Sequence, residues 1–126
     1  MKNNLKKKLT VSTAIGILVV GSCFPSFAAG TKTKTVDGIR VTATSSVSGR
    51  TATASTERTK AGTVSVYMYY EYKQTNSNII GTGTRQDTRG GTIAKVSYTP
   101  SNAVKMYDVS GTHKAYLPSG ELVLYT

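Results

Sequence analysis

Four tyrosines that lie close together offer the side chains best suited to binding chemistry: Tyr67, Tyr69, Tyr70 and Tyr72. The residue types alternate in this segment with a period of two, which is typical of a β-strand. The alternation places Tyr70 and Tyr72 on one side of the strand with Met68, and Tyr67 and Tyr69 on the other. An outward tyrosine can stack on a sugar ring or join a protein interface, because its ring is apolar and its hydroxyl stays in water. Packing against neighbouring strands is an equally good interpretation.

The sequence is strongly basic, but its positive charges are dispersed. It has 16 Lys and Arg residues against 6 Asp and Glu residues in 126, which gives a net charge of +10. Such an excess favours a cell-envelope polymer, an anionic lipid surface, a polysaccharide or a partner protein as the ligand. We expect Lys73, Arg85 and Arg89 to contribute to binding with Tyr67 and Tyr69. Alternatively, the charges serve solubility and protect the edges of a sheet.

Residues that could carry out catalysis are sparse. The one histidine, His113, follows Asp108 closely, and a Ser-His-Asp arrangement could be built around it. However, the sequence lacks a Gly-x-Ser-x-Gly motif that would supply a nucleophile. We therefore interpret His113 as an exposed strand residue beside Lys114. The scattered carboxylates neither show nor exclude the convergent pair that a glycosidase needs. We predict no catalytic residue, and a small secreted hydrolase is the least favoured function.

Cofactor and metal chemistry has little support in the composition. One cysteine and one histidine exclude a metal centre built from several thiolates or imidazoles, and we predict no cofactor. The glycine-rich segments 81–84 and 90–91 do not open a helix, so they do not fit a phosphate-binding loop. We interpret them as turns or bulges between strands.

Residues 1–28 have the pattern of a secretory signal peptide. A basic start of four lysines precedes an apolar run of about 12 residues, which is shorter than the roughly 20 that span a bilayer as a helix. Small residues at Ser26 and Ala28 predict peptidase cleavage after Ala28. The short lysine-rich start is typical of Gram-positive bacteria. We therefore expect a bacterial protein that is secreted into the extracellular medium.

A second processing site competes with this one. Residues 20–23 resemble the lipobox of bacterial lipoproteins, which would make Cys23 a lipid anchor at the cell surface. We prefer cleavage after Ala28, because a complete peptidase site follows within a few residues. Removal of residues 1–28 leaves 98 residues with a net charge of +6 and no cysteine. Such a domain depends on a packed apolar core.

Beyond the signal peptide, strand patterns dominate. Residues 29–35 lack an apolar anchor, so we predict a flexible N-terminal arm over residues 29–36. Residues 39–59 alternate as a hairpin, Ala61-Gly62 breaks the pattern, and Arg89–Gly91 marks a further turn. Six to eight short strands are expected in all. The sequence therefore predicts an all-β fold for residues 37–126, a single small antiparallel β-sandwich or partly open barrel.

These features together favour a secreted, non-enzymatic β-sandwich that binds an anionic envelope component, a polysaccharide or a partner protein. Nucleic acid is an unlikely partner, because the protein is exported and its charge is dispersed. The alternative is a bacteriocin-like or membrane-active toxin. In composition alone, a small, secreted, basic, tyrosine-rich protein resembles the lactococcin-type sandwich bacteriocins. The hairpin of residues 39–59 also resembles the membrane-inserting hairpins of β-pore-forming toxins.

Overall fold

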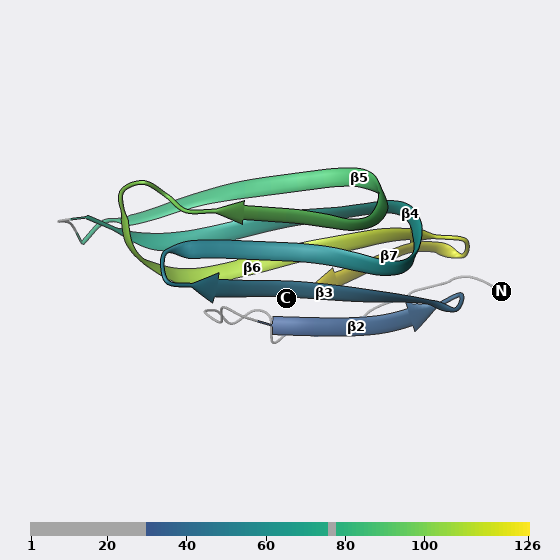
Figure 1. Cartoon of the computed structure of the whole chain (residues 1–126). Helices are drawn as coiled ribbons and strands as arrows, with labels where there is room; N and C mark the ends of the chain where they lie inside the picture. Colours follow the sequence, from purple (N-terminus) through teal and green to yellow (C-terminus); the bar gives the residue numbers. More distant parts are fainter. Residues whose placement is uncertain (1–29, 76–77) are drawn as a thin grey trace.

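The computed structural model describes residues 30–75 and 78–126 (Figure 1). The predicted signal peptide, the cleavage site at Ala28 and the alternative lipid anchor at Cys23 lie outside the described residues. In the part of the chain that is described, no helix is long and apolar enough to cross a membrane.

Within residues 30–75 and 78–126, six antiparallel strands form one continuous sheet, as their backbone pairings show. The strands are β2 (Gly30–Val36), β3 (Ile39–Ser48), β4 (Thr51–Gln74), β5 (Ile80–Tyr98), β6 (Ala103–Leu117) and β7 (Gly120–Tyr125). The prediction of an all-β antiparallel fold is confirmed. The strands are not all short, however, because β4 has 24 residues and β5 has 19.

The two longest strands bend together, and this bend curls the sheet into a half-barrel. The pairing of β4 with β5 shifts in register between Glu57 and Gly62, and Gly62 then pairs with Gly91. In Figure 1 both ribbons turn back at the right-hand end, so that the two parts of the sheet face each other. The half-barrel agrees with the partly open barrel that was predicted beside the β-sandwich. The predicted break at Ala61-Gly62 and the predicted turn at Arg89–Gly91 both fall in this bend, but neither ends a strand, because β4 and β5 continue through it.

The bend divides the sheet into two halves that differ in side-chain size. The threonine half consists of β2, β3, residues 51–57 of β4 and residues 93–98 of β5. The tyrosine half consists of residues 62–74 of β4, residues 80–91 of β5, β6 and β7. Between the halves, small side chains such as Ala52, Ala54 and Ala94 pack in one cluster with Met68 and Tyr70. Alternation along each strand therefore buries one side of both halves in a common core.

A buried arginine holds the bend. The side chain of Arg58 is only 6% exposed, and its guanidinium donates to the carbonyl oxygens of Lys60, Thr63 and Tyr116 at 2.6, 2.8 and 3.0 Å. A Cβ atom at Gly62 would lie 2.6 Å from the guanidinium carbon. Only glycine leaves room for the cation here, so Gly62 and Arg58 act together to fix the corner.

The expected flexible arm is a strand, which corrects the prediction for residues 29–36. Residues 30–36 form β2 and pair along their whole length with β3. Strand β2 adds to the sheet through backbone hydrogen bonds, and its β-branched threonines favour the extended conformation. Val36 at its end packs against the buried cluster that contains Ile39 and Val41. Lys32 pairs with Ala43 and Lys34 with Val41, so both lysines project from the inward side at the edge. Inward charges of this kind discourage further strands from adding to an edge.

Candidate functional site

The outer side of the tyrosine half gathers exposed tyrosines from three strands. On β4, Tyr67 lies opposite Gln86 of β5 and Thr112 of β6, and Thr112 lies opposite Tyr125 of β7. Directly paired residues share a face, so Tyr67 and Tyr125 stand two strands apart, or about 9–10 Å. Tyr116 of β6 has the same alternation as Thr112. We call this surface the tyrosine face, and its members Tyr67, Tyr116 and Tyr125 are 44%, 46% and 43% exposed.

An open groove of about 390 Å³ runs between Tyr67 and Tyr116 on this face. The remaining lining is mainly polar, with hydroxyls, one amide and one ammonium group. It comprises Ser65, Val66, Gln86, Thr88, Thr112 and Lys114. Rings at the two ends and hydrogen-bonding groups between them suit a ligand with flat apolar faces and many hydroxyls.

The charge of the groove is nearly balanced. The Nζ atom of Lys114 lies 3.9 Å from the Oε2 atom of Glu121, with both side chains partly exposed. The hydrogen bond between Tyr116 and Glu121 raises the pKa of the tyrosine, so its hydroxyl stays protonated. The groove therefore presents a neutral phenol and a compensated cation, rather than the concentrated positive charge that would select a polyanion.

Tyr69, the second predicted binding tyrosine, lies further along β4 and is already engaged. Its hydroxyl donates to the Oε2 atom of Glu71 at 2.8 Å, and this bond is the main cause of the raised pKa of Tyr69. Glu71 pairs with Asp108 across β4 and β6. Burial, and then the negative charge of Glu71, raise the pKa of Asp108. Sequence spacing gave no sign of this carboxylate pair, because only the register of β4 against β6 creates it.

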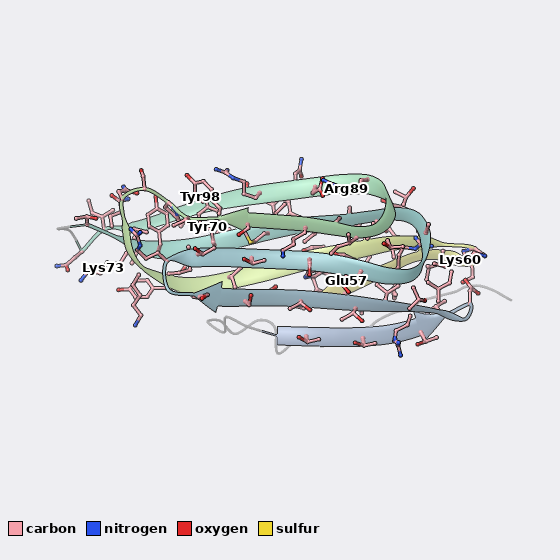
Figure 2. All side chains as sticks on the ribbon, in the orientation of Figure 1. Glu57, Lys60, Tyr70, Lys73, Arg89 and Tyr98 are labelled. Atoms are coloured by element: carbon pink, nitrogen blue, oxygen red, sulfur yellow. The ribbon has the colours of Figure 1, made fainter. Side chains whose placement is uncertain are left out.

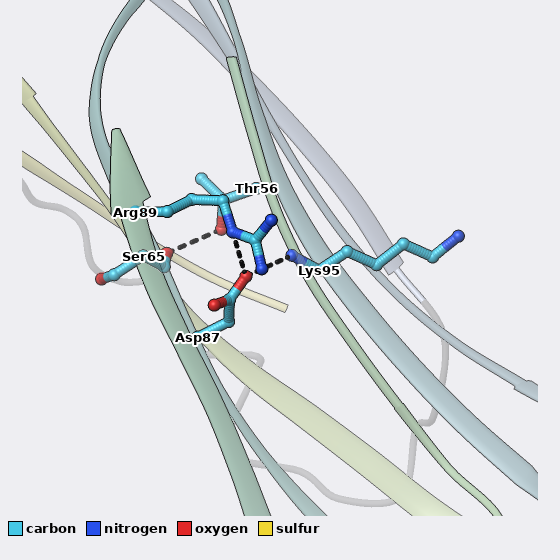
Figure 3. Close-up of polar contacts among 5 residues, drawn as sticks. All are labelled: Thr56, Ser65, Asp87, Arg89 and Lys95. Atoms are coloured by element: carbon cyan, nitrogen blue, oxygen red, sulfur yellow. Dashed lines mark hydrogen bonds and ion pairs between the residues drawn. The ribbon is translucent and has the colours of Figure 1, made fainter. Parts of the chain in front are cut away.

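The three predicted basic residues lie elsewhere. Arg85 stacks on Tyr98, with its guanidinium carbon 3.8 Å from the ring centroid. The Nε atom of Arg89 lies 2.8 Å from the Oδ2 atom of Asp87, which also accepts the backbone N–H of Lys95 at 3.3 Å (Figure 3). The contacts of Arg85 with Tyr98 and of Asp87 with Lys95 form a seam between residues 80–91 of β5 and residues 93–98 of the same strand. Arg89 lies at this seam, paired with Asp87.

Lys73 lies at yet another place, near the end of β4. It pairs with Ile80 of β5 and with Lys105 of β6. The five residues that we expected to act together are therefore divided. Tyr67 lines the groove, Tyr69 lies beside it, and the three basic residues lie at the seam and at the strand end.

His113 is buried, so the interpretation of an exposed strand histidine is wrong. The side chain is 1% exposed and lies on the inward side of β6. Its Nδ1 atom lies 2.8 Å from the Thr56 hydroxyl, and its Nε2 atom lies 2.8 Å from the Thr126 hydroxyl. The Thr56 hydroxyl donates its proton to the carbonyl oxygen of Ser65, as Figure 3 shows. Thr56 must therefore accept from Nδ1–H, which leaves Nε2 to accept from Thr126.

The hydrogen bonds of His113 belong to a larger polar network in the core. The Thr126 hydroxyl also contacts the hydroxyl of Ser45, so one polar chain joins β3, β4 and β6 inside the core. Burial lowers the pKa of His113 to about 4. The imidazole is consequently neutral near pH 7, which suits the single N–H that this network uses. Neither ring nitrogen is bonded to Asp108, the acid that the sequence placed nearby.

Comparison with known proteins adds no assignment for this site. Within the described residues, no group of three or more His, Cys, Asp and Glu side chains could hold a metal ion. No protein-family model, curated protein or solved structure matches the chain significantly. What the groove binds must therefore be inferred from its own geometry.

Only part of the groove could be predicted from the sequence. Alternation correctly placed Tyr67 outward, and the same alternation along residues 112–116 places Tyr116 on the side opposite to His113. Nothing in the sequence could have brought Tyr116 and Gln86 beside Tyr67, because that requires the registers of both β5 and β6 against β4.

Proposed function

We propose that this protein is a secreted, non-enzymatic module that binds an uncharged polysaccharide chain of a cell envelope along the tyrosine face. The observation that carries the proposal is the groove between Tyr67 and Tyr116, with hydroxyl and amide side chains between the two rings. Sugar rings offer apolar faces for stacking and hydroxyls for hydrogen bonding, and this lining offers the partner for each.

The shape of the groove also favours a chain over a small molecule. Its volume of about 390 Å³ would hold only a few sugar units. Because the groove is open on the outer surface of the sheet, a longer polymer could continue across the strands toward Tyr125. Sites for small molecules, by contrast, enclose most of the ligand surface.

The positions of the cations favour a neutral polymer over an anionic one. Arg85 and Arg89 are engaged at the seam, and Lys114 in the groove lies beside Glu121. An anionic polymer would meet little uncompensated charge there. We therefore favour a neutral glycan over the anionic component that the overall charge first suggested.

Affinity electrophoresis of the purified protein in gels that contain soluble cell-wall glycans tests the proposal. Removing one stacking ring is expected to weaken binding about tenfold, from the ring contact together with the apolar area lost. Tyr67→Ala and Tyr116→Ala should each show this loss. Ile93→Ala is the matched control, because Ile93 is 39% exposed on the threonine half and lies far from the groove in register.

Salt dependence separates the two kinds of polymer. Binding to a neutral glycan should persist from low salt to about 1 M salt, where the Debye length falls to about 3 Å. Retention that disappears over this range, or that survives in both tyrosine variants, would show that the groove does not bind a neutral chain.

A further inference from the structure

One end of the half-barrel exposes adjacent apolar side chains. Ile79 and Ile80, where β5 begins, are 62% and 46% exposed, and Tyr107 of β6 is 43% exposed. Two backbone hydrogen bonds show that three connections meet at this end. The N–H of Thr75 donates to the Asn102 carbonyl at 2.8 Å, and the N–H of Met106 donates to the Gly49 carbonyl at 3.5 Å.

Two lysines lie level with Ile80 in the sheet. Lys73 pairs with Ile80 on one side and Lys105 on the other, so the three residues form a row across three strands. The ammonium group of Lys105 lies 5.9 Å from the centroid of the Tyr107 ring. We call these five residues, Ile79, Ile80, Lys73, Lys105 and Tyr107, the isoleucine end. Lys73 is labelled at this end of the molecule in Figure 2.

The composition of the isoleucine end differs from that of an ordinary strand end. Two exposed isoleucines follow each other in the chain here, whereas single exposed apolar residues are common on any protein. Positive charge and a tyrosine lie nearby on β4 and β6. The nearest carboxylates, Glu71 and Asp108, form the next cross-strand pair along β4 and β6, away from Ile80. Exposed isoleucines level with lysines, with carboxylates further from the strand ends, are the arrangement expected of a surface that contacts the headgroup region of an anionic bilayer.

We propose that the isoleucine end docks on an anionic lipid bilayer. Ile79 and Ile80 enter the boundary between headgroups and acyl chains, while Lys73 and Lys105 contact lipid phosphates. Tyr107 lies at the headgroup level, where its ring and hydroxyl are both satisfied. The positive charge of the lysines complements the lipid and selects it over an uncharged partner surface.

This contact is compatible with the proposed glycan site. The groove reaches Tyr116, which pairs with Glu121 next to the turn between β6 and β7. The isoleucine end lies at the opposite end of β6, where that strand begins. A molecule that stands on the bilayer by its isoleucine end would therefore leave the groove open. The bilayer proposal does not depend on the glycan proposal.

Flotation of the purified protein with lipid vesicles tests the bilayer contact. The vesicles contain phosphatidylcholine alone or phosphatidylcholine with one third phosphatidylglycerol. We expect flotation with the anionic vesicles at low salt. The double variant I79S/I80S should bind at least about tenfold more weakly, since each buried isoleucine contributes an apolar side chain. Lys73→Gln and Lys105→Gln should each weaken binding about fivefold, on the anionic vesicles only.

Matched controls come from the threonine half. Ile93→Ser and Lys95→Gln remove an exposed isoleucine and an exposed lysine far from the isoleucine end, and both should float like the unchanged protein. Thermal unfolding checks that I79S/I80S remains folded. No glycan is present, so failure of the glycan proposal would not affect this result.

Three outcomes would overturn the bilayer contact. The unchanged protein could fail to float with anionic vesicles at low salt, or I79S/I80S could float as well as it does. Sedimentation velocity could also show a dimer that I79S/I80S abolishes while vesicle binding is absent, which would assign the isoleucine end to contact between two copies of the chain.

Discussion

The threonine half and the tyrosine half belong to one sheet, and both alternate inward and outward side chains, yet they differ in what those side chains are. The outer side of the threonine half carries short hydroxyls that bond across strands, as between Thr53 and Ser97 at 3.1 Å and between Thr51 and Thr99 at 2.6 Å. Its inward side carries mainly small residues such as Ala43, Ala52 and others of that size. The tyrosine half carries large side chains on both sides.

This difference shows that alternation sets which side faces the core, while side-chain size sets what each half can do. The large inward residues of the tyrosine half, such as Met68 and Tyr70, fill the space that the small residues opposite leave open. Its outward tyrosines then stand on a well-packed support. We therefore expect substitutions in the tyrosine half to have larger effects than substitutions in the threonine half.

The largest effect is expected where the two halves share the buried network of His113. The pKa of His113 is about 4 in the folded protein against an ordinary value of 6.5. Folding thus favours the neutral ring, and the contribution is fully present above pH 6.5. It is lost as the pH falls from about 6.5 through about 4, and it amounts to about 3 kcal/mol. Urea unfolding at several pH values measures it.

The His113→Gln variant provides the comparison for this prediction. Glutamine can still donate and accept a hydrogen bond but does not titrate, so the free energy of unfolding should fall less over the same pH range. Carboxylates titrate in both proteins and cancel in the difference. Equal slopes of stability against pH in the two proteins would show that His113 is not the group that couples folding to acid.

Much of the fold could be predicted from the sequence, because alternation is a local property. The strand around Met68 and the hairpin of residues 39–59 agree with the structure. The break predicted at Ala61-Gly62 is instead a bend within the continuous strand β4. The bend was harder to predict, since the sequence Gly90-Gly91 indicates a turn unless its pairing with residues 62–63 is known. The burial of His113 was missed for a similar reason. Its hydroxyl partners lie far away in the sequence, and no local sequence pattern indicates which residues they are.

The next largest effect concerns glycines under the inward tyrosines. A Cβ atom at Gly83 would overlap the hydroxyl end of Tyr70, which is 4% exposed and cannot easily move aside. Gly83→Ala should therefore lower the free energy of unfolding by about 1–3 kcal/mol. Gly90 is the control, because a Cβ there meets nothing within 4 Å and its φ is not positive. Gly90→Ala should change stability by less than about 0.5 kcal/mol.

Chemical denaturation of Gly83→Ala and Gly90→Ala measures whether the added methyl group lowers or raises the free energy of unfolding. The interpretation that Gly83 weakens its strand for lack of a side chain predicts the reverse order, with Gly83→Ala more stable than the unchanged protein. A stabilised Gly83→Ala variant would therefore show that Tyr70 can move, and that the tyrosine half is less tightly packed than its contacts indicate.

The smallest effect is expected on the threonine half, at Thr53. Its hydroxyl bonds to that of Ser97 on the outer side of the sheet, where water can replace the bond when it is lost. Thr53→Ala removes this pair and some preference for the extended backbone, so it should cost less than about 1 kcal/mol in unfolding free energy. The backbone pairing of β4 with β3 and β5 remains in place. A loss of unfolding free energy as large as that of Gly83→Ala would contradict the expected difference between the two halves. It would mean that the hydroxyls of the threonine half stabilise the fold as strongly as the packed rings of the tyrosine half do.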